Sequence, residues 1–159
     1  MFIRVKTITK YRYAYLVESI WKNGKTKQRV KKYLGKVLVF EDTKPLTHTT
    51  KNTLITDFLE QLGFTQQKAQ YIYNTQIAYA TKTTTLTFTT TKPAVIQVNE
   101  GFVCTVTLRN LKKLLEKAYV LENQQDDITT LATALIDCGI RLDKKAFISL
   151  YSELANIAL

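Results

Sequence analysis

The stretch that decides the N-terminal fold is residues 11–34, YRYAYLVESIWKNGKTKQRVKKYL, in which two runs of strand-forming residues flank Asn23-Gly24. Tyr, Val, Ile and Trp suit the pleated surface of a β-sheet. Asn-Gly between such runs is the strongest local signal for a two-residue type I′ turn, because both central residues of that turn need a positive φ angle. The pattern therefore predicts a hairpin made of strands 11–21 and 25–34.

A further strand precedes this hairpin. Residues 2–8 are again rich in β-branched and aromatic side chains, and Lys10 lies in a short polar break before the next run. The first 40 residues are thus expected to form a three-stranded antiparallel β-meander.

The turn also predicts how the two hairpin strands pair. On a face that mixes basic and apolar residues, the expected pairs are Lys22–Lys25, Ile20–Lys27, Glu18–Arg29, Leu16–Lys31 and Ala14–Tyr33. On the other face they are Trp21–Thr26, Ser19–Gln28, Val17–Val30, Tyr15–Lys32 and Tyr13–Leu34. We expect the second face to be the core side. A slip of one residue would exchange the two faces, so which face is exposed stays open.

The charge of the chain is concentrated in the same region. Residues 1–40 hold 11 of the 23 Lys and Arg residues but only one of the 13 acidic residues, Glu18, so they account for the whole formal charge of +10. Such asymmetry indicates a polyanionic partner, with nucleic acid first, an anionic membrane surface second and an acidic protein third.

Basic and aromatic residues alternate along the meander, as a surface that binds nucleic acid requires. Lys and Arg neutralise phosphates and release counterions, whereas Tyr and Trp stack on exposed bases. The alternative is that the lysines keep a sheet edge soluble and the tyrosines form its apolar underside. The candidate phosphate contacts are Arg4, Lys6, Arg12, Lys22, Lys25, Lys27, Arg29, Lys31 and Lys32, and the candidate stacking or groove contacts are Tyr11, Trp21 and Tyr33.

The remainder of the chain is expected to be a linker at 41–52 and a mainly helical unit at 53–159. Apolar spacing predicts a helix over 54–62 that ends at Gly63, and a second one from Thr65 to about Ala80, the two spaced like a helix-turn-helix. Residues 81–92 favour a strand or extended loop, and 94–98 a short strand. Further helices are expected from Thr107 to near Leu121, from 128 to 138 before Gly139, and after Asp143.

The sequence contains no pattern of residues typical of a catalytic, metal-binding or nucleotide-binding site. One histidine, His48, and two distant cysteines, Cys104 and Cys138, give no zinc-ligand spacing, and there is no phosphate-binding glycine loop. We therefore expect no cofactor, no metal and no enzymatic activity. The two cysteines are expected to be buried structural thiols, and Asp126 and Asp127 to cap or solvate a helix. Without a long apolar run or a leader pattern, a cytoplasmic protein is expected.

Four segments carry a resemblance to a known family: Phe2–Lys6, Tyr15–Ser19, Lys27–Val30 and Tyr33–Lys36. In this order and spacing they resemble the N-terminal module of insertion-sequence transposases of the DDE type, and the start of short archaeal proteins that share it. Residues 98–102 and 107–109 are similar to the archaeal proteins as well. The transposase module precedes a catalytic domain whose acidic residues bind magnesium, and nothing in residues 41–159 matches that domain. The resemblance therefore implies binding without catalysis.

Together these observations predict an α+β protein that binds duplex DNA or structured nucleic acid, with DNA versus RNA left open. A ribosome-associated protein that binds ribosomal RNA is the first alternative. The second is a protein-interaction module, in which the helical unit dimerises or recruits a partner and the basic strands serve solubility or an acidic protein.

Overall fold

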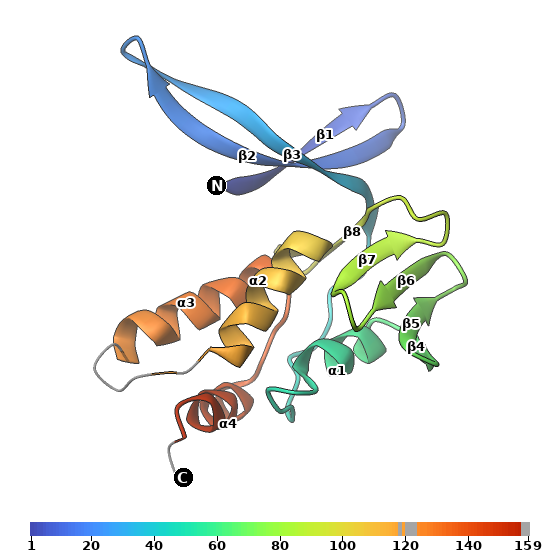
Figure 1. Ribbon diagram of the computed structural model, residues 1–159, viewed down its shortest axis with the longest axis vertical. Helices are drawn as coiled ribbons and strands as arrows, with labels where there is room; N and C mark the ends of the chain where they lie inside the picture. Colours follow the sequence, from blue (N-terminus) through green and yellow to red (C-terminus); the bar gives the residue numbers. More distant parts are fainter. Residues whose placement is uncertain (118, 120–123, 157–159) are drawn as a thin grey trace.

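The computed structural model describes residues 1–117, 119 and 124–156, and in that part the chain is a mixed α+β protein. Four helices and nine strands are found there, and the strands form two sheets. Figure 1 shows the N-terminal strands of the first sheet lying across one end of the molecule, above helices α2 (Thr105–Glu116) and α3 (Gln124–Asp137), with α4 (Lys144–Leu154) at the opposite end. In the described part no helix combines the length and the apolar character needed to cross a membrane.

The first sheet begins with the expected meander. Strands β1 (Phe2–Ile8), β2 (Tyr11–Lys22) and β3 (Lys25–Val39) pair antiparallel in sequence order. The sheet then continues through β8 (Ala94–Val98), which is parallel to β3, and β9 (Gly101–Val103). The sheet is therefore mixed rather than purely antiparallel, and one hydrogen-bonded layer joins residues 1–40 to the later part of the chain.

The predicted turn is confirmed, and so is the register next to it. Asn23 and Gly24 have φ angles of 53° and 71°, as a type I′ turn requires. Pairing follows the prediction from Lys22–Lys25 back to Val17–Val30.

Beyond Val17 the predicted register is wrong, because two irregularities shift β3 against β2. The observed pairs are Leu16–Lys32, Tyr15–Tyr33, Ala14–Gly35 and Tyr13–Lys36. Each shift leaves one extra residue on β3, which is the definition of a β-bulge. Gly35 has a φ angle of 136°, and a Cβ atom there would lie 2.3 Å from the carbonyl oxygen of Pro93, so the second bulge needs glycine.

The expected core side of the meander is also wrong. The aliphatic face is the one that packs inward: Ala14 is fully buried, and Ile3, Val5 and Leu16 pack with it against Phe102 and Val106. Of the side chains expected on the core side, Val17 and Leu34 are buried, while Tyr13 and Tyr15 are half-buried and Trp21 is exposed.

A second sheet replaces the helix expected after Thr65. Strands β4 (Thr65–Gln67), β5 (Gln70–Tyr73), β6 (Ile77–Ala80) and β7 (Thr85–Phe88) form an antiparallel meander. Positive φ angles at Lys68, Asn74 and Thr75 reverse the chain between the first three strands. The helix-turn-helix prediction is therefore wrong, whereas the extended segment within 81–92 and the strand at 94–98 are confirmed.

The helices lie close to their expected positions. Helix α1 (Leu54–Gln61) is followed by Gly63, whose N–H donates to the Glu60 carbonyl at 3.0 Å. Helix α2 (Thr105–Glu116) begins before Thr107, because Cys104 is the N-cap and Thr107 closes the capping box. Helix α3 (Gln124–Asp137) ends before Gly139, and Asp143 caps α4 (Lys144–Leu154) by accepting the Ala146 N–H at 2.7 Å. Helix α2 ends at Glu116, where Lys117 turns to an extended conformation, so the end expected near Leu121 was placed too late.

The main core lies between the second sheet, β8 and the helices. It contains Phe58, Ile77, Leu86, Ile96, Leu108 and Leu131, all fully buried, together with Cys138. Residues 41–52 are irregular as expected but are tied to this body: Leu46 donates its N–H to the Arg141 carbonyl at 2.8 Å and accepts the Asp143 N–H at 3.0 Å. The segment expected to be a linker is thus a fixed strap across the body.

Candidate nucleic-acid interface

The outer half of the β2–β3 hairpin, residues 18–32, is a basic arm. Figure 1 shows this half of the hairpin reaching beyond the rest of the sheet. Every residue from 21 to 33 is exposed, and Trp21 retains 74% of its accessible surface. The arm carries six of the candidate cations: Lys22, Lys25, Lys27, Arg29, Lys31 and Lys32.

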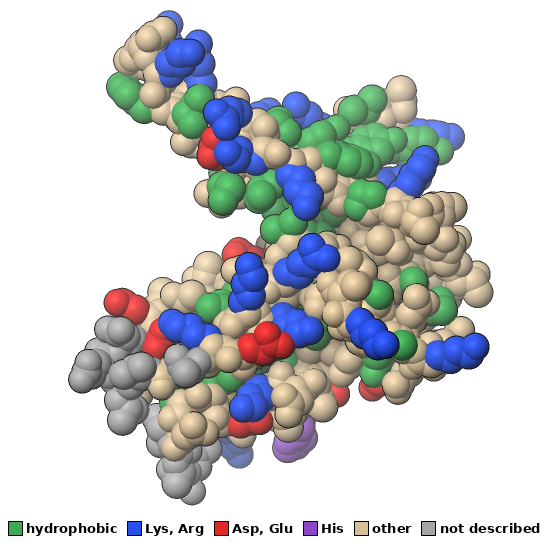
Figure 2. All heavy atoms as spheres, viewed as in Figure 1, with side chains coloured by type: hydrophobic (Ala, Val, Ile, Leu, Met, Phe, Trp, Pro, Cys, Tyr) green, Lys and Arg blue, Asp and Glu red, His purple; other side chains and the backbone are tan. Residues whose placement is uncertain are grey.

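Local pairing holds the arm together without a core beneath it. Glu18, at its base, binds the two cations across from it: Arg29 Nε lies 3.2 Å and Lys31 Nζ 3.4 Å from Glu18 Oε1. The type I′ turn closes the other end. Among the described residues, Lys22, Lys25, Lys27 and Lys32 form no ion pair, so their charges face solvent uncompensated. Figure 2 shows Lys and Arg side chains gathered along this projecting hairpin.

The inner half of the hairpin carries a second surface, the tyrosine face, made of Tyr11, Tyr13, Tyr15 and Tyr33. Tyr15 and Tyr33 are cross-strand partners with ring centroids 5.4 Å apart, and the rings of Tyr13 and Tyr33 are 6.4 Å apart. Burial raises the pKa of Tyr33, with smaller contributions from Tyr15 and Tyr13, so its phenol is neutral at physiological pH.

Cations border the tyrosine face. Lys36 Nζ lies 3.8 Å from the ring centroid of Tyr11, and Lys6 Nζ lies 5.3 Å from that of Tyr15. Arg4, the cross-strand partner of Tyr15, donates from its guanidinium to the Gln28 side chain on the arm. This contact connects the edge of the tyrosine face to the arm.

The structure therefore divides the predicted site residues into groups. Arg4, Lys6, Tyr11 and Tyr33 belong to the tyrosine face; Trp21 and the six cations listed above belong to the arm. Arg12 pairs with Thr7 on the opposite face of the sheet and joins neither group.

The sequence prediction did not include Tyr13, Tyr15 and Lys36, which the structure places beside the predicted candidates, in the candidate site. The sequence pattern could have identified the two tyrosines of β2: Tyr11, Tyr13 and Tyr15 alternate on one face of the strand, while the other face carries Ala14 and Leu16. Tyrosine keeps a polar hydroxyl that favours contact with water, whereas the aliphatic side chains do not.

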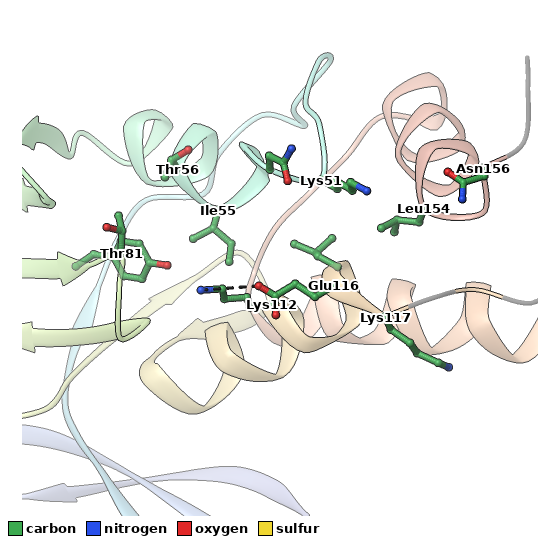
Figure 3. A pocket seen from close by; sticks show the side chains of 12 residues that line it. Lys51, Ile55, Thr56, Thr81, Lys112, Glu116, Lys117, Leu154 and Asn156 are labelled. Atoms are coloured by element: carbon green, nitrogen blue, oxygen red, sulfur yellow. Dashed lines mark ion pairs between the residues drawn. The ribbon is translucent and has the colours of Figure 1, made fainter.

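Several hollows lie outside these surfaces. One lies beneath the meander and measures about 600 Å³. Its walls are Phe2, Ile3 and Leu16 on one side and Val106 of α2 on the other, with Arg109 and Lys113 also lining it. Another, about 590 Å³, lies among α1, α2 and α4 (Figure 3).

The hollow in Figure 3 is polar but has no catalytic set among its described lining residues. Lys112 Nζ lies 4.0 Å from Glu116 Oε1, and Lys117 Nζ donates to Asp127 Oδ1 at 3.0 Å. No serine, cysteine or histidine lines it in the described part of the chain. The Lys117–Asp127 pair links the end of α2 to the first turn of α3.

The remaining candidate residues occupy structural positions. His48 is exposed in the strap, and Cys104 and Cys138 are buried free thiols, as predicted. Asp126 and Asp127 lie in the first turn of α3, where their negative carboxylates interact favourably with the positive end of the helix dipole. Within residues 1–117, 119 and 124–156 no group of three or more His, Cys, Asp or Glu residues could hold a metal ion.

Comparisons with protein-family models, with curated proteins and with solved structures found no match. The similarity of residues 2–36 to transposase N-termini stays a prediction from sequence.

Proposed function

We propose that this protein binds nucleic acid without catalysis, and that the basic arm docks on duplex DNA or structured nucleic acid through phosphate contacts. The observation that carries the proposal is the exposure of residues 21–32 together with four lysines there that form no ion pair among the described residues: Lys22, Lys25, Lys27 and Lys32. The six cations of the arm lie on a segment that covers no core. In a surface packed against protein, burying these charges would cost free energy.

The shape of the arm suits a duplex groove. From Glu18 to Lys22 the arm extends about 13 Å at about 3.3 Å per residue. The major groove of B-DNA is about 12 Å wide and 8.5 Å deep and admits a two-stranded β-ribbon. The arm is therefore long enough to reach the floor of a groove while Lys31 and Lys32 stay near the phosphates at its rim.

The same charge pattern can follow an RNA backbone, so the proposal covers both polymers. RNA duplexes are read mainly by shape and by phosphate and 2′-hydroxyl contacts. A preference for structured RNA would favour a ribosome-associated role, and a preference for DNA would favour a chromosomal one.

Shortening the arm tests the proposal directly. Deleting residues 19–22 and 25–28 leaves Glu18-Asn23-Gly24-Arg29, so the turn and the Glu18–Arg29 pair are kept. An even number of residue pairs is removed, which keeps a hydrogen-bonded pair next to the turn. The deletion removes three lysines, Lys22, Lys25 and Lys27.

Binding is measured by fluorescence anisotropy on duplex DNA and structured RNA across a salt series. If each deleted lysine contacts one phosphate, the salt slope on DNA becomes shallower by about 2.7, and affinity at 0.1 M salt falls by about 500-fold. The matched control is Lys82→Gln with Lys144→Gln and Lys145→Gln, which removes the same charge from exposed positions elsewhere. Equal binding by the shortened and control proteins would refute docking through the arm.

A further inference from the structure

The tyrosine face is a second exposed surface, separate from the arm in position and in chemistry. Alternation along β2 puts Tyr11, Tyr13 and Tyr15 on one face, and the β3 bulge opposite Leu16 and Val17 brings Tyr33 opposite Tyr15. Tyr11 and Tyr33 keep 39% and 44% of their accessible surface. The aliphatic face of the same strands already covers α2, so the sheet does not need the tyrosines for its packing against the body.

The electrostatics of this face favour an anion. Residues 1–17 contain no acidic side chain, and the one carboxylate of the first 40 residues, Glu18, is bound to Arg29 and Lys31. Arg4, Lys6 and Lys36 surround the rings. A neutral peptide or lipid partner would match the apolar rings alone, whereas a nucleic-acid strand matches both the rings and the positive border.

Exposed rings in this setting suit unpaired bases rather than base pairs. Base stacking on an aromatic side chain is stronger than the cation–π contact that an exposed lysine makes with the same ring. A base can therefore displace Lys36 from the ring of Tyr11, and the freed ammonium can bind the phosphate of the same nucleotide. Bases inside a duplex cannot do this, because their faces are already stacked.

We infer that the tyrosine face binds unpaired nucleotides next to the helix held by the arm, so that the preferred ligand is a junction between duplex and single strand. The inference rests on the proposed function. Both surfaces lie on one hairpin, and the Arg4–Gln28 contact joins them.

The test compares a blunt duplex with the same duplex carrying a short unpaired pyrimidine overhang, each made as DNA and as RNA. The full chain is expected to bind the overhang form of its preferred polymer about tenfold more tightly or better, the effect of one or more base stacks. Tyr11→Leu with Tyr33→Leu should abolish this preference and leave blunt-duplex affinity unchanged. Tyr11→Phe with Tyr33→Phe, which keeps the rings, should retain it.

A direct signal comes from the arm-shortened protein, which lacks the only tryptophan, Trp21. Its emission arises from tyrosine and should be quenched by an oligopyrimidine, and this quenching should be lost in the leucine variant.

The outcomes separate the two proposals. Equal affinity for blunt and overhang ligands, or a preference that survives the leucine substitutions, overturns the inference while binding through the arm stands. Tyrosine-dependent binding of an oligopyrimidine without any arm-dependent duplex binding refutes the proposed function and leaves the stacking surface in place.

Discussion

Neutralising two arm lysines, Lys25→Gln with Lys27→Gln, should weaken nucleic-acid binding without unfolding the protein. Both side chains are exposed, and neither forms an ion pair among the described residues. Lys25 lies opposite Lys22, so its substitution also removes a like-charge pair across the strands, which is mildly unfavourable to the hairpin. We therefore expect no loss of thermal stability.

The magnitude follows from counterion release. If each lysine neutralises one phosphate of B-DNA, the slope of log affinity against log salt becomes shallower by about 1.8. Affinity then falls by about 60-fold at 0.1 M salt and by about ninefold at 0.3 M, and the extrapolated affinities at 1 M coincide. Anisotropy titrations over this salt range, with melting curves of each protein, measure all three quantities.

The control for net charge is Lys144→Gln with Lys145→Gln. These lysines open α4, at the opposite end of the molecule from the arm in Figure 1, and both are exposed. The control removes the same charge and should change affinity little. If the arm variant and the control lose the same affinity, binding depends on net charge rather than on the arm, and the reasoning is refuted.

Two further predictions concern the fold. Gly101→Ala should destabilise the protein by about 3 kcal/mol in denaturant unfolding, because its Cβ would lie 2.1 Å from the Ile136 carbonyl oxygen. A Cβ atom added at Gly24 would have no neighbour within 4 Å, so Gly24→Ala should lower the free energy of unfolding only by the cost of a left-handed alanine, about 1–2 kcal/mol. Equal losses in the Gly101 and Gly24 variants would contradict the close approach of β9 and α3. Burial raises the pKa of Cys138 to about 12 from 9.0, so the unfolded chain loses this proton first. The contribution of the Cys138 thiol to the free energy of unfolding is therefore fully present below pH 9 and should fall by about 1.4 kcal/mol per pH unit above it. In urea unfolding, Cys138→Ala should reduce this dependence of the free energy of unfolding on pH between pH 9 and 10.

The hairpin could be predicted from sequence because its cause is local. Asn23-Gly24 specifies the turn through its own φ angles, and the pairs nearest the turn follow from chain geometry. The helix boundaries at Gly63, Gly139 and Asp143 also have local causes, since each depends on a few hydrogen bonds made within one turn of helix. These parts of the sequence analysis are confirmed.

Residues 65–80 could not be predicted in the same way. Their apolar residues fit a helical period as well as a strand period, and only the packing of Ile77 and Tyr79 against the core decides for strands. Burial of alternate side chains and cross-strand pairing outweigh the weak helical preference of single residues.

In the candidate site, too, some features follow from the local sequence and others from tertiary packing. Sequence alone determined the excess of basic charge in the first 40 residues, the three strands and the turn that exposes the arm lysines. The tertiary structure decided which face of the meander is buried, because α2 and β9 offer an aliphatic surface that Ala14 and Leu16 match and Tyr13 and Tyr15 do not. It also decided the two bulges of β3. The bulge opposite Leu16 and Val17 places Tyr33 beside Tyr15, and the second bulge lies where Gly35 approaches Pro93, a residue far away in the chain. Register and face depend on such distant contacts, which is why composition and periodicity could identify the basic strands but could not assemble the tyrosine face.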